Sequence, residues 1–441
     1  MRDSNKKIYQ LIIVILIILF LISLMQIKHG TSKLKFIDPL LNYTADIIPN
    51  AYQGLKSLYY AGILTGSEQI DFNIKPVDIV NYVDDGYLLL SLYNPNLSQN
   101  IIRLIKLENN EVIYQWIPKL ADFFKKKFPN LSKDELNKKV ELFRLQHPLI
   151  DQNGFIYTNG PGELIKINPC GEVVDYNNDF YFHHSLNFNK DKSKIYVPAT
   201  DYETKLNFLN RQITNEGFAV IDVSNMQVVQ FVSLIEILKK NNFLDELNHS
   251  FLYNQNDIIH LNDVEPILED DKYFTTNHIA FSSRHLSSVF LLDLLSEKII
   301  FYKNYPLLAN HDIDYQGDGI FSIFNNNYFI PPKGKAHNDD KMLVDILFYD
   351  FKTDSFYSPY KDSLNKIKAI TAAQGSHTVI GDDIIIEPND ERYVARISKS
   401  DIKWKKYFTL NNSAATQTHW HRYFSSDKEI EDFIKNLSCN N

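Results

Sequence analysis

The sequence predicts an all-β protein, a six-bladed β-propeller preceded by one N-terminal transmembrane helix. Two observations predict this fold: six similar hairpin patterns follow one another along most of the chain, and one long apolar stretch lies near the N-terminus. The composition agrees, because 13% of the residues are aromatic, and aromatic and β-branched side chains fit a pleated sheet surface. With 441 residues, of which 44% are hydrophobic, the chain is long enough for a large core.

The apolar stretch is residues 8–27, and it follows Arg2, Lys6 and Lys7. A helix of about 20 residues spans about 30 Å, the thickness of a bilayer core. An uncleaved anchor is favoured over a cleaved signal peptide, because residues 26–29 lack the small side chains of a cleavage site. The basic flank predicts that residues 1–7 are cytoplasmic and that the rest lies on the periplasmic or extracellular side of the membrane.

The predicted domains follow from the change of pattern along the chain. Residues 28–70 have no strong period and are interpreted as a stalk or packing segment, residues 71–425 as the propeller, and residues 426–441 as a tail. In each hairpin, two alternating strands flank a polar turn. The six hairpins span residues 101–116, 163–176, 218–232, 289–303, 346–360 and 393–407.

Two more strands precede most hairpins, as at 258–267 and 277–284, so the repeating unit has four strands. Radial repetition of such units is a β-propeller, and the alternative is a pair of β-sandwiches. Residues 121–146, which contain the capping-box-like Ser132 to Glu135, and residues 234–247 are predicted to be helical insertions. Residues 418–424 are predicted to supply a closing strand.

Charge and cysteine content limit the class of protein. The net charge is -8, both signs are spread along the chain, and no basic stripe occurs, so no nucleic-acid partner is expected. Cys170 and Cys439 are compatible either with one disulfide in an oxidising compartment or with two free thiols.

Histidines recur at the start of three successive inner strands of the predicted propeller. His183 and His184 come first, His260 second and His311 third, and Arg284 lies on the strand next to that of His260. One histidine on a strand is usually structural, but three in equivalent places beside an arginine favour a functional site. Arginine presents a fork of donors to oxyanions, and histidine can donate with one nitrogen and attack with the other. The pattern predicts a site for a compact oxyanion, and it requires no acidic side chain.

Four blocks in this region resemble the motifs of the PAPS-independent arylsulfotransferases. They are Asp179 to Ser185, Ile259 to Pro266, Ser282 to His285, and Asn310 to Asn325, in the family's order. The resemblance implies an enzyme that moves a sulfuryl group from a phenolic sulfate ester to a phenol through a sulfated histidine, without a cofactor. By position, His311 matches the nucleophile, while His184, His260 and Arg284 match the residues that hold the sulfuryl oxygens. His183 is the alternative to His184, and His183 and Asn262 are expected to bind substrate.

Other interpretations remain open at this point. His184, His260 and His311 could instead bind zinc as a His₃ set, although Arg284 disfavours a second cation there. His377 is interpreted as structural, Asp312 and Asp314 as orienting or solvated groups, and residues 189–193 as a plain turn rather than a calcium loop. The alternative function is a non-catalytic, membrane-tethered propeller that binds an anionic ligand or a partner protein.

Overall fold

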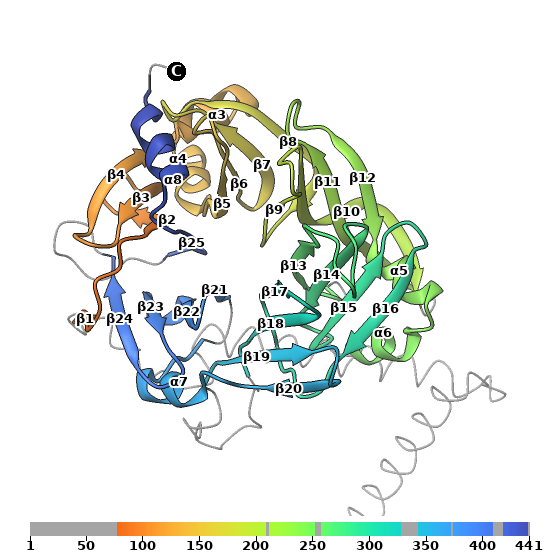
Figure 1. Ribbon diagram of the computed structural model, residues 1–441. Helices are drawn as coiled ribbons and strands as arrows, with labels where there is room; N and C mark the ends of the chain where they lie inside the picture. Colours follow the sequence, from red (N-terminus) through yellow and green to blue (C-terminus); the bar gives the residue numbers. More distant parts are fainter. Residues whose placement is uncertain are drawn as a thin grey trace, which may run out of the picture. The chain divides into compact units, whose positions relative to one another are not determined.

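The computed structural model describes residues 77–208, 211–251, 257–327, 343–371, 374–408 and 418–439. Their strands form five hydrogen-bonded sheets, arranged around a common centre (Figure 1). Three of these sheets have four strands each. In order, they are β25 (Arg422–Phe424), β2 (Tyr87–Asn94), β3 (Gln99–Lys106), β4 (Glu111–Trp116); β13 (Leu261–Pro266), β14 (His278–Ser283), β15 (Ser288–Asp293), β16 (Lys298–Lys303); and β17 (Ile313–Gly317), β18 (Ile320–Asn325), β19 (Asp345–Asp350), β20 (Ser355–Tyr357).

The other two sheets are larger. The five-stranded sheet has the order β1 (Ile79–Val80), β24 (Ile402–Tyr407), β23 (Tyr393–Ile397), β22 (Asp383–Glu387), β21 (Ser376–Ile380). The eight-stranded sheet has the order β12 (Val228–Ser233), β11 (Arg211–Asp222), β10 (Lys194–Phe208), β8 (Val173–Phe182), β7 (Gly162–Ile167), β6 (Ile156–Asn159), β5 (Gln146–Ile150), with β9 (Asn187–Phe188) paired to β10.

The prediction of a six-bladed propeller is therefore wrong, because the described strands form five sheets and only three of these have four strands. The physical reason lies in β8. This strand pairs with β7 along most of its length, and its end pairs with β10, where Phe182 lies opposite Ala199 and Tyr181 opposite Thr200. Two units that the sequence pattern separates are thus joined into one propeller-like sheet.

All six predicted hairpins are present as antiparallel pairs, namely β3 with β4, β7 with β8, β11 with β12, β15 with β16, β19 with β20, and β23 with β24. The turn between β7 and β8 contains Gly171, whose φ of +79° favours glycine. A Cβ added there would lie 2.3 Å from the carbonyl oxygen of Ile117. The local alternation of apolar residues therefore predicts the hairpins correctly, whereas it does not predict which hairpins share a sheet.

Both ends of the described chain close the ring of sheets. β25 pairs with β2, which confirms the predicted closing strand, and β1 pairs with β24. The first and last sheets also share a hydrophobic cluster that includes Leu88, Leu90, Ile385 and the fully buried Trp404. Burial of this apolar surface stabilises the closure more than the short strands could alone.

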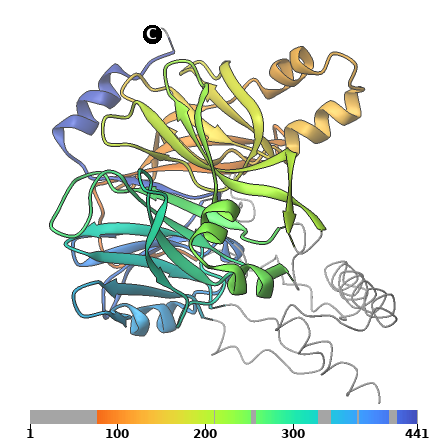
Figure 2. The same cartoon turned by 90° about the vertical axis from the view of Figure 1, so that its right-hand side faces the viewer.

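The helices lie outside the sheets and confirm both predicted insertions. The first consists of α3 (Leu120–Lys127) and α4 (Lys133–Leu142), and Ser132 and Glu135 form a complete capping box. The second consists of α5 (Leu234–Lys240), which contacts β11, β12 and β16, and α6 (Leu244–Phe251). The two insertions lie at separate places, orange and green in Figure 2. Two further helices, α7 (Lys361–Ile367) and α8 (Lys428–Asn436), and the short 3₁₀ helix η2 (Asn389–Glu391) complete the described elements.

Left-handed residues occur in the turns that lead into the innermost strands. Leu145, His184, His260, Ala309, Gln374 and Trp420 all have φ between +48° and +65°. A polar side chain from elsewhere in the sheets holds several of these turns. The Asn159 amide donates to the carbonyl of His184 at 3.1 Å, and the Glu216 carboxylate accepts from the backbone N–H of Ile259, His260 and Leu261. Non-glycine residues are strained in this region, so such bonds are needed to keep them there.

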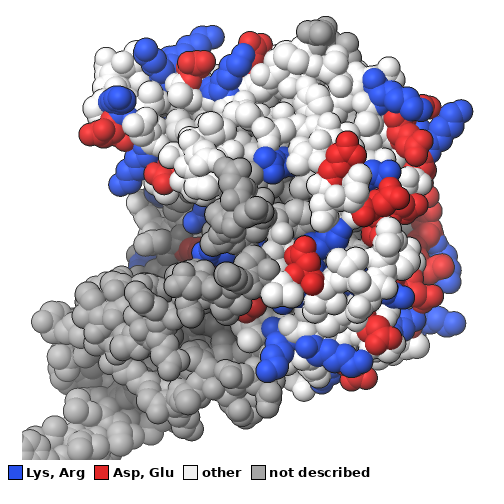
Figure 3. Space-filling model, turned by 90° about the vertical axis from the view of Figure 1, so that its left-hand side faces the viewer, with Lys and Arg blue, Asp and Glu red and all other residues white. Residues whose placement is uncertain are grey.

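Cys170 and Cys439 form a disulfide, so the bridge is the correct one of the two alternatives left open by the sequence. On the face shown in Figure 3, positive and negative side chains are interspersed. No helix within the described ranges is both long and apolar enough to cross a bilayer. The predicted anchor at 8–27, with the flanking segments 1–7 and 28–70, lies outside those ranges.

Candidate functional site

A cavity of about 510 Å³ lies where the turns before β9 and β13 meet. His183, His184 and His260 line it, together with Tyr181, Tyr202 and other side chains. Both tyrosines are substantially exposed, at 37% and 54%, so the cavity has aromatic walls that solvent reaches. A small aromatic molecule could therefore lie beside the imidazoles.

The left-handed turns bring three of the predicted histidines together. The ring centre of His184 lies 5.0 Å from that of His260 and 6.4 Å from that of His311. No such ring contact with His260 or His311 is present for His183 in the described structure; instead, His183 Nδ1 lies 2.6 Å from Nδ1 of His184. Desolvation and the neighbouring histidines, with Arg284, hold the pKa of His184 well below 6.5. His184 thus occupies the centre of the group, and His183 supports it.

His311 is fixed in one tautomer by its two neighbours. Asn326 donates its amide hydrogens to the carbonyls of Thr371 and Gln374, so its oxygen is the acceptor that faces His311 Nδ1 at 2.7 Å. His311 Nδ1 therefore carries the proton. The backbone N–H of Gln374 donates to Nε2 at 2.8 Å, which leaves the lone pair on Nε2.

His311 is also held neutral. Its side chain is 1% exposed, and burial, followed by the charge of Arg284, lowers its pKa well below 6.5. A neutral imidazole with a lone pair on Nε2 is the form that can act as a nucleophile.

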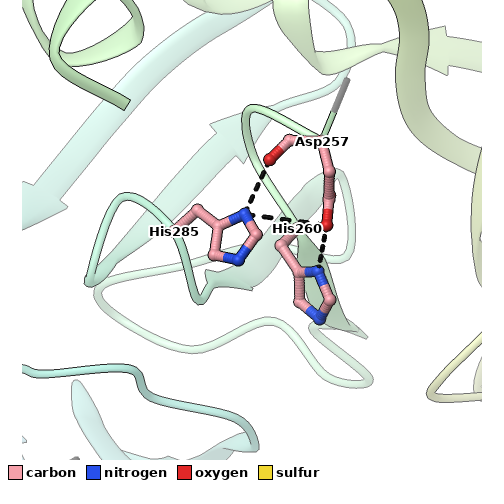
Figure 4. Close-up of side chains that lie close together, drawn as sticks. All are labelled: Asp257, His260 and His285. Atoms are coloured by element: carbon pink, nitrogen blue, oxygen red, sulfur yellow. Dashed lines mark hydrogen bonds and ion pairs between the residues drawn. The ribbon is translucent and has the colours of Figure 1, made fainter. Parts of the chain in front are cut away.

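His260 has a carboxylate partner that the sequence analysis did not require. His260 Nδ1 lies 2.6 Å from Asp257 Oδ2, and the second imidazole of this cluster, His285, has its Nδ1 2.6 Å from the Asp257 carbonyl oxygen (Figure 4). The opposite nitrogen of His285 lies 3.4 Å from Nη1 of Arg284. A guanidinium only donates, so this pairing places the proton of neutral His285 on Nδ1. Burial, followed by the charge of His260, lowers the pKa of His285 to about 3.

The structure brings His184, His260, His311 and Arg284 into one neighbourhood. The guanidinium of Arg284 lies close enough to lower the pKa of both His184 and His311. Asn262, by contrast, is fully buried and does not line the cavity; its amide donates to the carbonyl of Asn310 at 3.0 Å. Asn262 thus fixes the residue next to His311. His311 and Arg284 do not line the cavity either. Gln374, whose backbone N–H donates to His311, does line it.

Comparison with known proteins decides the family. The profile of the family described as arylsulfotransferase (ASST) matches residues 150–405, which is more than half of the chain and includes every predicted site residue. The chain belongs to the arylsulfotransferase (ASST) family. Membership indicates an arylsulfotransferase-like function on small aryl substrates, and it agrees with the resemblance found in the sequence blocks.

Other comparisons add little to the arylsulfotransferase assignment. No curated protein matches the chain. Among solved structures, hydrazine synthase of Kuenenia stuttgartiensis is 11% identical, with 68% of this chain and 70% of that chain covered and a TM-score of 0.40. The WD40 domain of Neurospora crassa Pan2 is also 11% identical, with 76% and 79% covered and a TM-score of 0.38.

The described residues of this arylsulfotransferase-family chain contain two clusters with the composition of metal sites, and neither is the predicted His₃ alternative. One is Asp257, His260 and His285, and the other is Asp312, Asp314 and His377. In the second cluster, His377 Nδ1 lies 2.9 Å from Asp312 Oδ2 and Nε2 lies 2.7 Å from the hydroxyl of Ser322. Desolvation opposes the charged form of His377, but Asp314 and Asp312 outweigh it and raise the pKa. Asp312 therefore orients His377, which is a structural role.

Four residues of the neighbourhood were missed by the sequence analysis. Asp257 and Gln374 lie in turns and Glu216 lies within β11, and no repeat or motif marks any of them. Each contacts a site histidine that is distant in the sequence or reached through an irregular turn. Asn326 carried a weak signal, because it directly follows the block that ends at Asn325. A side chain whose function is to orient another is hard to identify before its partner's position is known.

Proposed function

We propose that this protein transfers a sulfuryl group from a phenolic sulfate ester to a phenol, with His311 as the nucleophile. The observation that carries the proposal is the state of His311: buried, neutral, and with its lone pair on Nε2. Burial and a nearby cation keep this imidazole unprotonated at neutral pH, as attack on sulfur requires. Family membership supports the reaction class.

The first half-reaction forms a sulfated histidine. The lone pair of His311 Nε2 forms an N–S bond while the S–O bond to the donor ring breaks, and the departing phenolate takes a proton from protonated His260. In the second half-reaction, His260 Nε2 accepts the proton of the acceptor phenol. The new phenolate then attacks sulfur, the N–S bond breaks, and His311 regains its lone pair. Atoms and charge balance over the cycle, and no cofactor takes part.

Arg284 and His184 are proposed to hold the oxygens of the sulfuryl group. In an in-line displacement, the negative charge is spread over three equatorial oxygens, by analogy with phosphoryl transfer. A guanidinium donor and a donor imidazole that are already in place stabilise this charge without reorganisation. Tyr181 and Tyr202 offer the aromatic ring a place in the cavity.

One observation favours the second candidate function, a non-catalytic propeller-like module that binds an anion. The N–H of Gln374 occupies the lone pair of His311 Nε2, and it must be displaced before sulfur can be attacked. A binding module would never require that displacement. The two functions differ in whether a covalent adduct forms.

The disulfide between Cys170 and Cys439 supports a location outside the cytoplasm. We propose that residues 8–27 anchor the protein as a single pass and that the described domain lies on the periplasmic or extracellular side. Fractionation of cells should place the protein with the membrane, and protease added from outside should digest the domain. Protection from external protease would overturn this orientation.

The decisive experiment mixes the protein with 4-nitrophenyl sulfate. Wild type is expected to release 4-nitrophenol in a burst and to gain the mass of one SO₃ group on His311, as seen by mass spectrometry of peptides. His311→Asn should show neither, while His278→Gln, a histidine of β14 that lies apart from the cavity, should behave as wild type. Binding of the ester by wild type without any adduct would establish the binding module instead.

A further inference from the structure

The orientation of His260 matters if this imidazole exchanges protons with the two phenols, a role that rests on the proposed function. His260 lines the cavity and is the residue just before β13, where its own backbone is left-handed with a φ of +48°. Nothing in the covalent structure fixes which of its nitrogens carries the proton. The contacts of its surroundings must do so, because an acid and base at Nε2 needs a defined state at Nδ1.

Asp257 supplies that contact. Its Oδ2 lies 2.6 Å from His260 Nδ1, a distance typical of a charge-assisted hydrogen bond. A carboxylate only accepts, so Nδ1 of His260 donates. Burial raises the pKa of Asp257, but the charge of His260 and its hydrogen bond lower it further, so the net pKa lies below the ordinary value and the carboxylate stays ionised.

Asp257 is itself held from a second side. The Nδ1–H of His285 donates to the Asp257 carbonyl oxygen at 2.6 Å, and Nε2 of His285 is 3.4 Å from the guanidinium of Arg284. Asp257 therefore sits between two imidazoles: its backbone carbonyl accepts from His285, which also contacts Arg284, and its carboxylate accepts from His260. Because the proton of His285 is placed on the nitrogen that faces Asp257, this cluster acts as a hydrogen-bonded group rather than a set of free metal ligands.

The consequence lies at the other nitrogen of His260. Nε2 is on the side of the ring away from Asp257 (Figure 4), and among the described residues it has no hydrogen-bond partner. We propose that Asp257 is a positioning residue, whose carboxylate fixes the proton on His260 Nδ1 and stabilises the imidazolium, so that Nε2 is the acid for the leaving phenolate and the base for the acceptor phenol.

This role predicts a dependence on the leaving group. Phenyl sulfate releases a basic phenolate that needs a proton, whereas 4-nitrophenyl sulfate releases a weakly basic one that hardly does. Loss of general acid catalysis typically lowers a rate by about 10²- to 10⁴-fold. Asp257→Asn should therefore slow kcat for phenyl sulfate by about 100-fold and for 4-nitrophenyl sulfate by less than about 10-fold, with KM little changed for both.

Two variants serve as controls. Asp257→Glu keeps a carboxylate and should restore part of the rate with phenyl sulfate. Asp191→Asn removes an exposed carboxylate that accepts from the backbone N–H and the hydroxyl of Ser193 in its own turn, and it should leave both rates unchanged. The thermal unfolding midpoint of each variant shows whether it is folded.

The outcomes separate the two proposals. Equal slowing with both donors, in a folded Asp257→Asn protein, would overturn the positioning role while leaving sulfuryl transfer intact. Failure of the wild type to form any adduct on His311 would overturn the proposed function itself. A stronger loss with phenyl sulfate, rescued in part by glutamate, would support Asp257 as the positioning residue of His260.

Discussion

Arg284 brings a permanent positive charge to the three histidines of the site. Its side chain is half-buried, it lies within 3.4 Å of His285 Nε2, and its charge depresses the pKa of His184 and His311. If this guanidinium holds sulfuryl oxygens, its interaction is stronger in the transition state than with the free ester. Loss of one such donor typically raises the barrier by about 3 to 4 kcal/mol.

Arg284→Ala should accordingly lower kcat by about 10²- to 10³-fold, with a smaller effect on KM, as measured by steady-state release of 4-nitrophenol. Arg284→Lys keeps the charge but not the fork of donors, so it should recover part of the rate. Arg103→Lys is the matched control and should retain full activity. The guanidinium of Arg103 donates to Gln115 between β3 and β4, in a different sheet from the strands beside Arg284. A loss under tenfold for the alanine variant would remove Arg284 from the sulfuryl site.

At this scale, the sequence pattern singled out residues that repeat and gave no signal for residues that do not. His184, His260 and His311 all come shortly before an inner strand, β9, β13 and β17, so their proximity could be expected from the order of strands, although their offsets from the strands differ. Asp257 and Gln374 reach the same histidines from irregular turns, and no period predicts their direction. Asn262 was expected to bind substrate. It is the second residue of β13 and is fully buried, and its amide donates to the carbonyl of Asn310.

Elements of the fold depend on a small set of polar side chains that hold the left-handed turns. Glu387 is fully buried at the end of β22, and its carboxylate accepts from the backbone N–H of Trp420 at 3.0 Å and of His421 at 2.6 Å. These bonds orient the chain just before β25, the strand that closes the first sheet. The sequence predicted a closing strand at 418–424 but gave no sign of what holds it, since one glutamate at the end of an apolar strand does not show which backbone groups its carboxylate will bond.

Glu387→Gln should weaken this closure, because an amide NH₂ would replace one acceptor and face a backbone donor. An unsatisfied buried group of this kind costs about 1 to 3 kcal/mol. Urea unfolding should show a loss of that size, and the amides of β25 should exchange faster with solvent. Glu236→Gln, at an exposed position in α5, should change the free energy of unfolding by less than about 0.5 kcal/mol. Unchanged amide exchange in β25 would show that the Glu387 carboxylate does not hold this closure.

The described domain is a ring of sheets, and its arrangement was only partly predictable. The spacing of apolar residues and the capping pattern at Ser132 are local properties, so they located the hairpins and both helical insertions. Sheet membership depends on hydrogen bonds between strands distant in sequence, such as the pairing of Phe182 with Ala199 that merges two predicted units. The same limit applies to the tail at 426–441, where Ile430, Phe433 and Ile434 of α8 pack on the cluster around Trp116.

A covalent bond ties the end of the described chain to the turn between β7 and β8. Cys170 lies in the turn between β7 and β8, and Cys439 follows α8, so the disulfide joins residues 269 apart in sequence. A crosslink over so long a segment restricts the unfolded chain far more than the folded one. The loss of such a bond typically lowers the free energy of unfolding by about 2 to 5 kcal/mol.

Cys170→Ser should therefore shift urea unfolding to lower concentration by an amount equivalent to about 2 to 5 kcal/mol. Cys439→Ser and the double variant should show the same shift, because removal of either sulfur removes the whole crosslink, so the two effects should not add. Wild type with its disulfide reduced should unfold at the same urea concentration as the serine variants. The serine variants keep α8 packed by its apolar face, so hydrogen exchange in α8 separates loss of the crosslink from loss of the helix. Additive losses in the double variant would mean that each cysteine acts alone as a thiol, and the proposal of an oxidising location would lose its support.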